Sequence, residues 1–179
     1  MRLFLYISIS FYFFISLLFA EETRQVDKHE HGVSELNIAI QSNTMVLEFM
    51  IPGADIVGFE YEAKSEQDKA TVNAALTKFD DYNNIFIIPT NSKCLLVSSK
   101  ININQEDDHD EHQEEAHNEF YAKYTFECGD IKSLDLLEFP YFETFSNSGE
   151  LEVQFVSEIG STSFEVEADS PIINIEGKI

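Results

Sequence analysis

The chain has 179 residues, of which 33 are Asp or Glu and 11 are Lys or Arg, so its formal net charge at neutral pH is −22. Such a charge repels polyanions, which argues against nucleic acids and anionic membrane surfaces as partners and favours cations. The length suits one domain with a substantial hydrophobic core.

Residues 1–20 have the pattern of a cleavable secretory signal peptide. Arg2 precedes an apolar run that ends at Ala20, and the acidic pair Glu21-Glu22 follows. A retained membrane anchor is the alternative, because the run has about the minimum length that spans a bilayer. We expect cleavage after Ala20. The remaining residues 21–179 then form a single domain, and the loss of Arg2 moves the net charge from −22 to −23.

The first half of the mature chain predicts a hairpin and a helix. Residues 33–40 and 44–51 alternate in part between apolar and polar side chains, and Gln41-Ser42-Asn43 between them favours a turn. The stretch Pro52-Gly53-Ala54-Asp55 ends the second strand. Ser65 followed by Asp68 resembles a helix N-cap, and apolar residues at helical spacing predict a helix over about 66–80.

The two cysteines predict how the middle of the chain pairs. Residues 94–103 and 120–128 read as antiparallel strands, and if Cys94 faces Cys128, then Leu96 faces Phe126 and Ser98 faces Tyr124. Two cysteines in an exported chain favour a disulfide between Cys94 and Cys128. Closing that loop would stabilise the fold by roughly 3–4 kcal/mol in the chain-entropy model. A pair of thiolate ligands to a metal is the alternative.

The last part of the chain predicts further strands. We expect them at residues 134–137, 149–157, 164–168 and 172–175, with a turn at 160–162 and a turn or one helical turn within 138–145. The sum is an α+β fold, a mainly antiparallel β-sheet domain with one helix (about 66–80) packed on it. A long disordered acidic loop, residues 105–119, would join two of its strands.

All five histidines lie in two polar segments, outside the predicted core. His29 and His31 are two residues apart, so in an extended chain both imidazoles point the same way and can bind one ion. Imidazole suits zinc, copper and nickel, and carboxylates can complete the shell. The candidate oxygen ligands are Glu30, Glu35 and Glu60.

The loop 105–119 holds eight carboxylates and the histidines His109, His112 and His117. The carboxylates raise the local cation concentration, and neutral histidines supply the more selective bonds, so zinc is the expected ion. Calcium is the main competitor, but the segment does not match an EF-hand loop. The alternative is that these are ordinary surface histidines in a solvated acidic loop, with no role in metal binding.

Catalytic motifs are absent from the sequence. It contains no HExxH, G-x-S-x-G, P-loop or dinucleotide-binding fingerprint. The sequence therefore predicts a protein that is not an enzyme.

The order of these motifs resembles the ZrgA-like periplasmic zinc-binding proteins over nearly the whole mature chain. The residues that carry the resemblance are His29-x-His31-Gly32, Glu35-Leu36-Asn37-Ile38-Ala39, Pro52-Gly53-Ala54-Asp55-Ile56-Val57-Gly58-Phe59-Glu60, the histidine-containing insert, Tyr124-x-Phe126-x-Cys128 and Leu151-Glu152-Val153-Gln154. The resemblance implies zinc binding in the periplasm of a Gram-negative bacterium, in support of zinc uptake beside an ABC-type importer. Members usually carry His directly after the Phe-Glu pair, where this chain has Tyr61, and their inserts are richer in histidine.

The sequence is therefore interpreted as an exported, non-enzymatic zinc-binding protein. His29 and His31, with Glu60, would form a fixed site, and the histidines of the insert would capture or hand over metal. The first rival is a periplasmic interaction module whose acidic loop docks a basic partner, with metal binding incidental. The second rival is a metal-dependent hydrolase.

Overall fold

The computed structural model describes residues 32–105 and 118–179. Its strands are β1 (Val33–Gln41), β2 (Thr44–Pro52), β3 (Cys94–Gln105), β4 (Asn118–Cys128), β5 (Leu136–Glu138), β6 (Glu150–Ser157), β7 (Gly160–Glu167) and β8 (Ile172–Asn174). The α-helices are α1 (Gly53–Val57), α2 (Glu66–Asp80) and α3 (Tyr141–Thr144), and three short 3-10 helices are Tyr82–Asn84, Thr90–Ser92 and Ile131–Ser133. No helix within the described ranges is long and apolar enough to cross a membrane.

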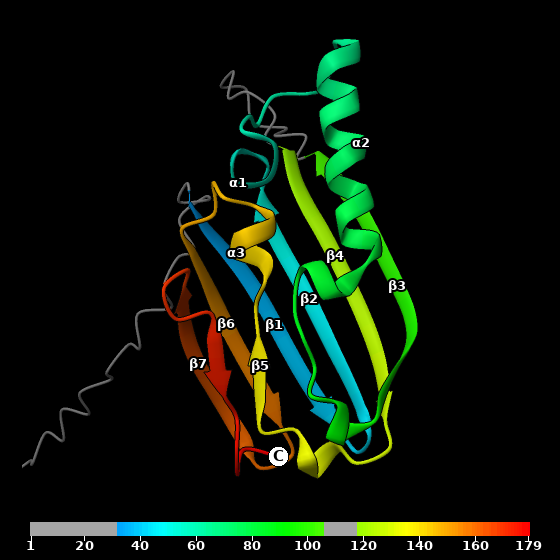
Figure 1. Ribbon diagram of the computed structural model, residues 1–179, viewed down its shortest axis with the longest axis vertical. Coiled ribbons are helices and arrows are strands. Elements are labelled where there is room, and N and C mark those ends of the chain that lie inside the picture. The colour runs from blue at the N-terminus through cyan, green and yellow to red at the C-terminus, as the bar shows by residue number, and fades with distance from the viewer. Residues whose placement is uncertain (1–31, 106–117) are drawn as a thin grey trace, which may run out of the picture.

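Six of the strands form one sheet in the order β3-β4-β2-β1-β6-β7, and β5 and β8 form a small second sheet (Figure 1). Every pair of neighbours in the large sheet is antiparallel except β1 and β6, which run parallel with Val33 opposite Glu150. The predicted α+β class with a mainly antiparallel sheet is confirmed.

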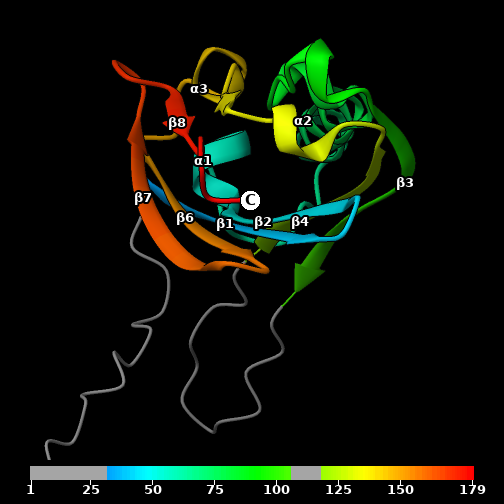
Figure 2. The ribbon, with the colours of Figure 1, turned by 90° about the horizontal axis from the view of Figure 1, so that it is seen from below.

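One face of the large sheet carries the core. Figure 2 shows α1, α2, α3 and β8 on the same side of the curved sheet, while no described element covers the opposite side. Because side chains alternate along a strand, every second residue of the sheet points into this layer. Phe49 on β2 lies within it, with ring centroids 5.9 Å from Phe86, 6.4 Å from Tyr124 and 6.5 Å from Tyr141.

The predicted helix is confirmed as α2. The Ser65 hydroxyl accepts the Asp68 backbone N–H at 3.0 Å, which satisfies one of the unpaired amides at the helix start. Ala75 and Phe79 are its buried residues, and the Phe79 ring stacks on Phe145 at 5.0 Å. Helix α1, which follows the strand-ending Pro52, was not predicted, whereas α3 agrees with the single helical turn that was one of the two alternatives expected within 138–145.

The disulfide is confirmed, and the register that it implies is confirmed only in part. Cys94 and Cys128 are joined, and they face each other at one end of the β3–β4 pair. Leu96 faces Phe126 as predicted, but a bulge between Leu96 and Ser98 shifts the register, so Ser98 faces Thr125. The extra residue of a bulge leaves no alternation signal in the sequence. Both cysteines are consumed in this bond, which removes the alternative of two thiolate metal ligands.

The turn between the last two long strands lies earlier than predicted. Ser157 pairs with Gly160, so Glu158 and Ile159 form a two-residue hairpin turn and Gly160 already belongs to β7. The expected turn at 160–162 is therefore wrong. The apolar run 85–89 forms a single bridge, Ile87 with Glu138, and the strand expected at 134–137 is the shorter β5.

A charged cluster on the uncovered face gives a pH-dependent contribution to stability. Glu48 on β2 accepts hydrogen bonds from Lys123 Nζ at 2.8 Å and from the Tyr121 hydroxyl at 2.7 Å. The hydrogen bond from Lys123, then that from Tyr121, holds the pKa of Glu48 below its ordinary value. Burial, then the Glu48 carboxylate, raises the pKa of Tyr121 to about 12.

We expect Glu48→Gln to lower the melting temperature at pH 7, by an amount that corresponds to less than about 1 kcal/mol for a partly exposed pair. A carboxyl whose folded pKa is lowered stabilises the fold above its unfolded pKa and loses this effect as the pH falls through the folded pKa. The gap between variant and wild type should therefore close below about pH 4. Thermal melts from pH 7 to pH 3 measure it, with Glu176→Gln as an exposed control. An equal gap at pH 7 and pH 3 would contradict the assignment.

Candidate functional site

The two histidine-bearing segments join the described fold at the same end of the large sheet. The predicted ligands that lie outside the described residues are His29, Glu30, His31, His109, His112 and His117. The described residues that directly follow His31 and His117 are Gly32, just before β1, and Asn118, at the start of β4. Only β2 lies between β1 and β4, so these two starts are about 10 Å apart at the usual strand spacing.

Gly32 is held by three backbone hydrogen bonds. Its N–H donates to Asp55 Oδ1 at 3.0 Å. Its carbonyl accepts from the N–H groups of Gly149 at 3.0 Å and Glu150 at 2.8 Å. Its φ of 89° lies in the region that favours glycine, so this residue sets the direction in which the chain enters β1. The chain directly after His31 is thus fixed at a defined point.

Asn118 is held against the residues that follow α1. Its N–H donates to the Glu60 carbonyl at 2.7 Å, and its side-chain Nδ2 donates to the Tyr61 carbonyl. The Asn118 residue is only 4% exposed. Glu60, a predicted metal ligand whose position is described, therefore lies beside the residue that follows His117. One of its carboxylate oxygens, Oε1, is buried.

Helix α1 lies between these two anchoring points. A Cβ atom on Gly53 would lie 2.7 Å from the Phe59 carbonyl oxygen and 2.9 Å from that of Asn118, so the close approach of these backbones requires glycine. At the other end, Gly58 with a φ of 81° caps α1 and turns the chain toward Glu60. The short helix thus contacts the residue after His117 and, through Asp55, the residue after His31.

Asp55 is the site residue that sequence analysis missed. The sequence placed Asp55 in a turn that ends a strand, whereas in the structure only 2% of this residue is exposed to solvent. It accepts hydrogen bonds from Gly32 and from the Ser34 hydroxyl, at 3.1 Å for the latter. The available signal was an acid among apolar neighbours, Ala54 on one side and Ile56 on the other. A buried carboxylate in such a position needs hydrogen-bond partners.

Glu35, the other candidate oxygen ligand that is described, lies on a different face. Its neighbour Ser34 points into the core with 0% exposure, so Glu35 points to the uncovered side of the sheet. There it forms a cross-strand row with Glu152 and Glu165, and a second row pairs Glu150 with Glu167. Like charges in register repel each other and concentrate cations. The β6–β7 hairpin pairs Glu152 with Glu165 and Glu150 with Glu167, and the pairing of β1 with β6, which local sequence patterns do not reveal, adds Glu35 to the first row.

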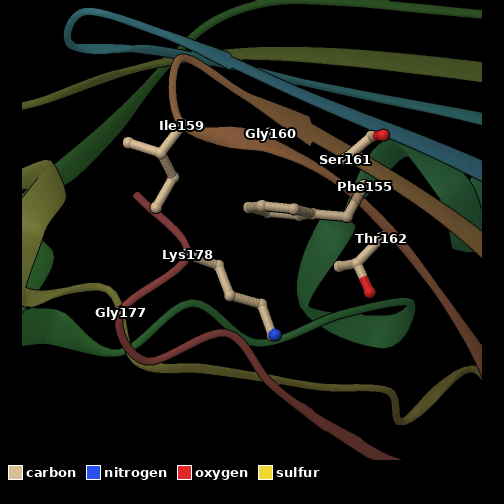
Figure 3. Close-up of a pocket in the computed structure, with 7 residues that line it drawn as sticks. All are labelled: Phe155, Ile159, Gly160, Ser161, Thr162, Gly177 and Lys178. Atoms are coloured by element: carbon tan, nitrogen blue, oxygen red, sulfur yellow. The ribbon is translucent and has the colours of Figure 1, made fainter.

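Two hollows lie at opposite ends of the sheet. One of about 270 Å³, beside Asn118, is lined by Glu62, Ala63, Val72, Ile103 and Asn118. The other, of about 140 Å³, lies at the β6–β7 turn and is lined by Phe155, Ile159, Gly160, Ser161, Thr162, Gly177 and Lys178 (Figure 3). The second hollow contains a cation and no carboxylate or histidine, so it does not suit a metal ion.

Within residues 32–105 and 118–179, no group of three or more His, Cys, Asp or Glu side chains is arranged to hold a metal ion. The described part of the chain instead holds the residues next to the histidine-bearing segments in place. These residues are Gly32 and Asn118, which are hydrogen-bonded to α1 and to Glu60. The fold therefore defines an α+β domain that brings two histidine-bearing segments to one end of its sheet.

The family model described as the ZrgA family of zinc uptake proteins matches residues 28–175 of the 179. The chain belongs to this family, whose described role is zinc uptake. The match begins directly before His29 and spans the acidic insert. No curated protein matches the chain.

Proposed function

We propose that the protein binds zinc in the periplasm of a Gram-negative bacterium, where it captures or buffers the ion and supports uptake as an accessory to an ABC-type importer. Membership of a zinc uptake family supports zinc as the bound ion. The observation that carries the site is the position of Gly32 and Asn118 at one end of the sheet, each bonded to α1 or to the residues just after it. The mature chain, released by signal cleavage, would not contact the membrane.

In this proposal, His29 and His31 together with Glu60 bind zinc at the end of the sheet where β1 and β4 begin. Two imidazoles and a carboxylate are a common zinc ligand set. The hydrogen bonds at Gly32 and Asn118 reduce the freedom of the adjoining chain, so less entropy is lost when an ion binds. His109, His112 and His117 supply additional, weaker capture sites in the insert.

The test is calorimetric titration of the metal-free mature protein with zinc at pH 7.5 and at pH 5.5. Histidine must be neutral to bind, and its ordinary pKa is about 6.5, so the zinc affinity should fall by about tenfold for each histidine that coordinates. Calcium titrated at pH 7.5 is the control and should give little heat. Weak heats shared equally by zinc and calcium would contradict histidine coordination.

The glutamate rows on the uncovered face favour a second candidate function, an interaction module for a basic partner. Glu35, Glu152 and Glu165 present three carboxylates in register across three adjacent strands. Partner binding that weakens with salt but is unaffected by a chelator would support this function. Partner binding that requires zinc would instead favour the zinc-handling role.

A further inference from the structure

The first half of β3 is an exposed strand at one edge of the large sheet. β3 pairs with β4 on one side, and within residues 32–105 and 118–179 no element pairs with its other side (Figure 1). All residues from Leu95 to Lys100 are exposed, whereas residues 101–103 are half-buried. Backbone N–H and C=O groups on the free side of this segment can therefore bond to a further strand.

Three consecutive apolar side chains lie at the start of this segment. Leu95 is 74% exposed, Leu96 is 40% exposed and Val97 is 61% exposed. Edge strands usually carry charged residues or proline, or are covered, and these features prevent pairing with another chain. The segment Leu95–Lys100 contains one charged residue and no proline, so its protection consists of Lys100 and the bulge between Leu96 and Ser98. A partner strand would bury part of this apolar surface.

The charges of the two sheet edges favour a second copy of the chain as the partner of β3. The protein has a net charge of −22, so two copies repel each other over most of their surfaces. The opposite edge strand, β7, carries Glu165 and Glu167. In contrast, the twelve residues of β3 include no Asp or Glu. β3 is therefore the sheet edge at which two acidic copies can pair without bringing carboxylates of the pairing strands together.

One antiparallel register also brings opposite charges together. Within one copy, Lys100 lies directly opposite Lys123, a like charge, and Leu95 lies directly opposite Glu127. All four side chains point to the uncovered face of the sheet, on which Lys123 contacts Glu48. If Leu95 of each copy lies opposite Lys100 of the other, the lysine side chain can cover Leu95 and reach toward Glu127 on the next strand. A two-fold axis makes this contact twice.

We propose that two copies of the protein associate through antiparallel pairing of their Leu95–Lys100 segments, with Leu95 of each copy opposite Lys100 of the other. The pairing joins the two large sheets into one. The contact is smaller than the roughly 1,200 Å² of a standard interface, so the dimer is weak, with a Kd of roughly 10–100 µM. The segment lies at the disulfide end of β3, so pairing does not cover the end of the sheet where Asn118 begins β4. The inference does not depend on zinc binding.

The experiment is sedimentation equilibrium of the mature protein with a chelator present, from about 1 to 500 µM, a range that brackets the expected Kd. Wild type should change from monomer to dimer over this range and form nothing larger, because a two-fold contact is closed. Leu95→Lys places two like charges opposite each other in the dimer and should raise the Kd at least about tenfold. It should not lower the melting temperature, because the new ammonium group lies opposite Glu127 of its own copy.

Ile159→Lys is the matched control. Ile159 is an apolar residue in the turn between β6 and β7 and is 64% exposed, so this substitution makes the same change in charge and in apolar surface away from β3. Its Kd should stay within about twofold of the wild-type value, because it does not touch the pairing segment.

A charge exchange tests the register. Lys100→Glu turns the two attractions with Glu127 into repulsions and should raise the Kd about tenfold. Combining it with Glu127→Lys restores opposite charges at the unchanged net charge and should return the Kd to within about threefold of wild type. Amide exchange gives a local measurement: the amides of residues 95–100 should exchange more slowly at the highest protein concentration than at the lowest in wild type, but not in Leu95→Lys.

Wild type that stays monomeric at the highest concentration would overturn the proposal, as would a dimer that forms only when the chelator is omitted. A dimer that Leu95→Lys leaves intact, or that Ile159→Lys weakens equally, would show that the contact lies elsewhere. Failure of the charge exchange to recover the dimer would overturn the register. Thermal melts check that each variant folds, and Lys100→Glu, at an exposed position, provides a second disruption of the contact.

Discussion

Replacing His29 and His31 together by alanine is expected to remove the tightest zinc binding of the protein. Removal of a group that only orients a ligand already costs about 10–100-fold in metal affinity, so loss of two ligands should cost about 100-fold or more. Both histidines precede the start of β1, so the described core should remain intact. Calorimetric titration at pH 7.5 measures the affinity, and a thermal melt without metal checks the fold.

The matched control removes the insert and keeps the first histidine pair. Gln105 and Asn118 pair directly across β3 and β4, so residues 106–117 can be replaced by an Asn-Gly turn without changing the register. This variant keeps the Asn118 contacts with Glu60 and Tyr61, and should bind fewer zinc ions while keeping the tightest site. If the shortened protein loses the tight site and the His29/His31 variant keeps it, the assignment of the two segments is reversed.

Replacing Cys94 and Cys128 together by serine is expected to lower the free energy of unfolding by about 3–4 kcal/mol. The cysteines are separated by 34 positions and pair at the end of the β3–β4 hairpin that lies opposite the insert. The disulfide thus reduces the conformational entropy of the unfolded chain. It also joins β3 to β4 at the point where the outer strand β3 begins. Urea unfolding measures the loss, and wild type treated with a reductant should give the same value.

The shortened insert also tests the origin of this stabilisation. Replacing the twelve residues 106–117 by the two-residue turn reduces the separation of the cysteines from 34 to 24 positions. In the chain-entropy model the disulfide should then contribute only about 0.3 kcal/mol less. A loss of most of the disulfide contribution in the shortened protein would indicate a specific interaction of the insert and not loop closure.

Much of the fold could be predicted because its signals are local. Ser65 and Asp68 define the start of α2 within a few residues, and the pairing of the two cysteines gives the β3–β4 register at its end. The prediction failed where the backbone departs from regular geometry, at the bulge after Leu96 and at the turn before Gly160. Neither feature changes the alternation of side chains enough to be recognised.

The frame of the site could not be predicted because it depends on contacts between distant parts of the chain. The sequence suggested Glu60 as a ligand, but not that its carbonyl accepts the N–H of Asn118. Asp55 looked like a turn residue, because its partner Ser34 lies 21 positions away and Tyr141 lies 107 positions beyond Ser34. Such contacts arise only when β1, α1 and α3 pack on one another.

The parallel pairing of β1 with β6 has a consequence for the order of folding. A chain made from its N-terminus exposes β1 long before β6, which begins at Glu150, is available. β1, β2, β4 and β3 can pair in the meantime, but one edge of β1 then stays open, and open strand edges promote association between chains. The last two long strands thus complete the sheet and also protect its central strand, so a chain that stops before β6 would present an unpaired edge in the middle of its fold.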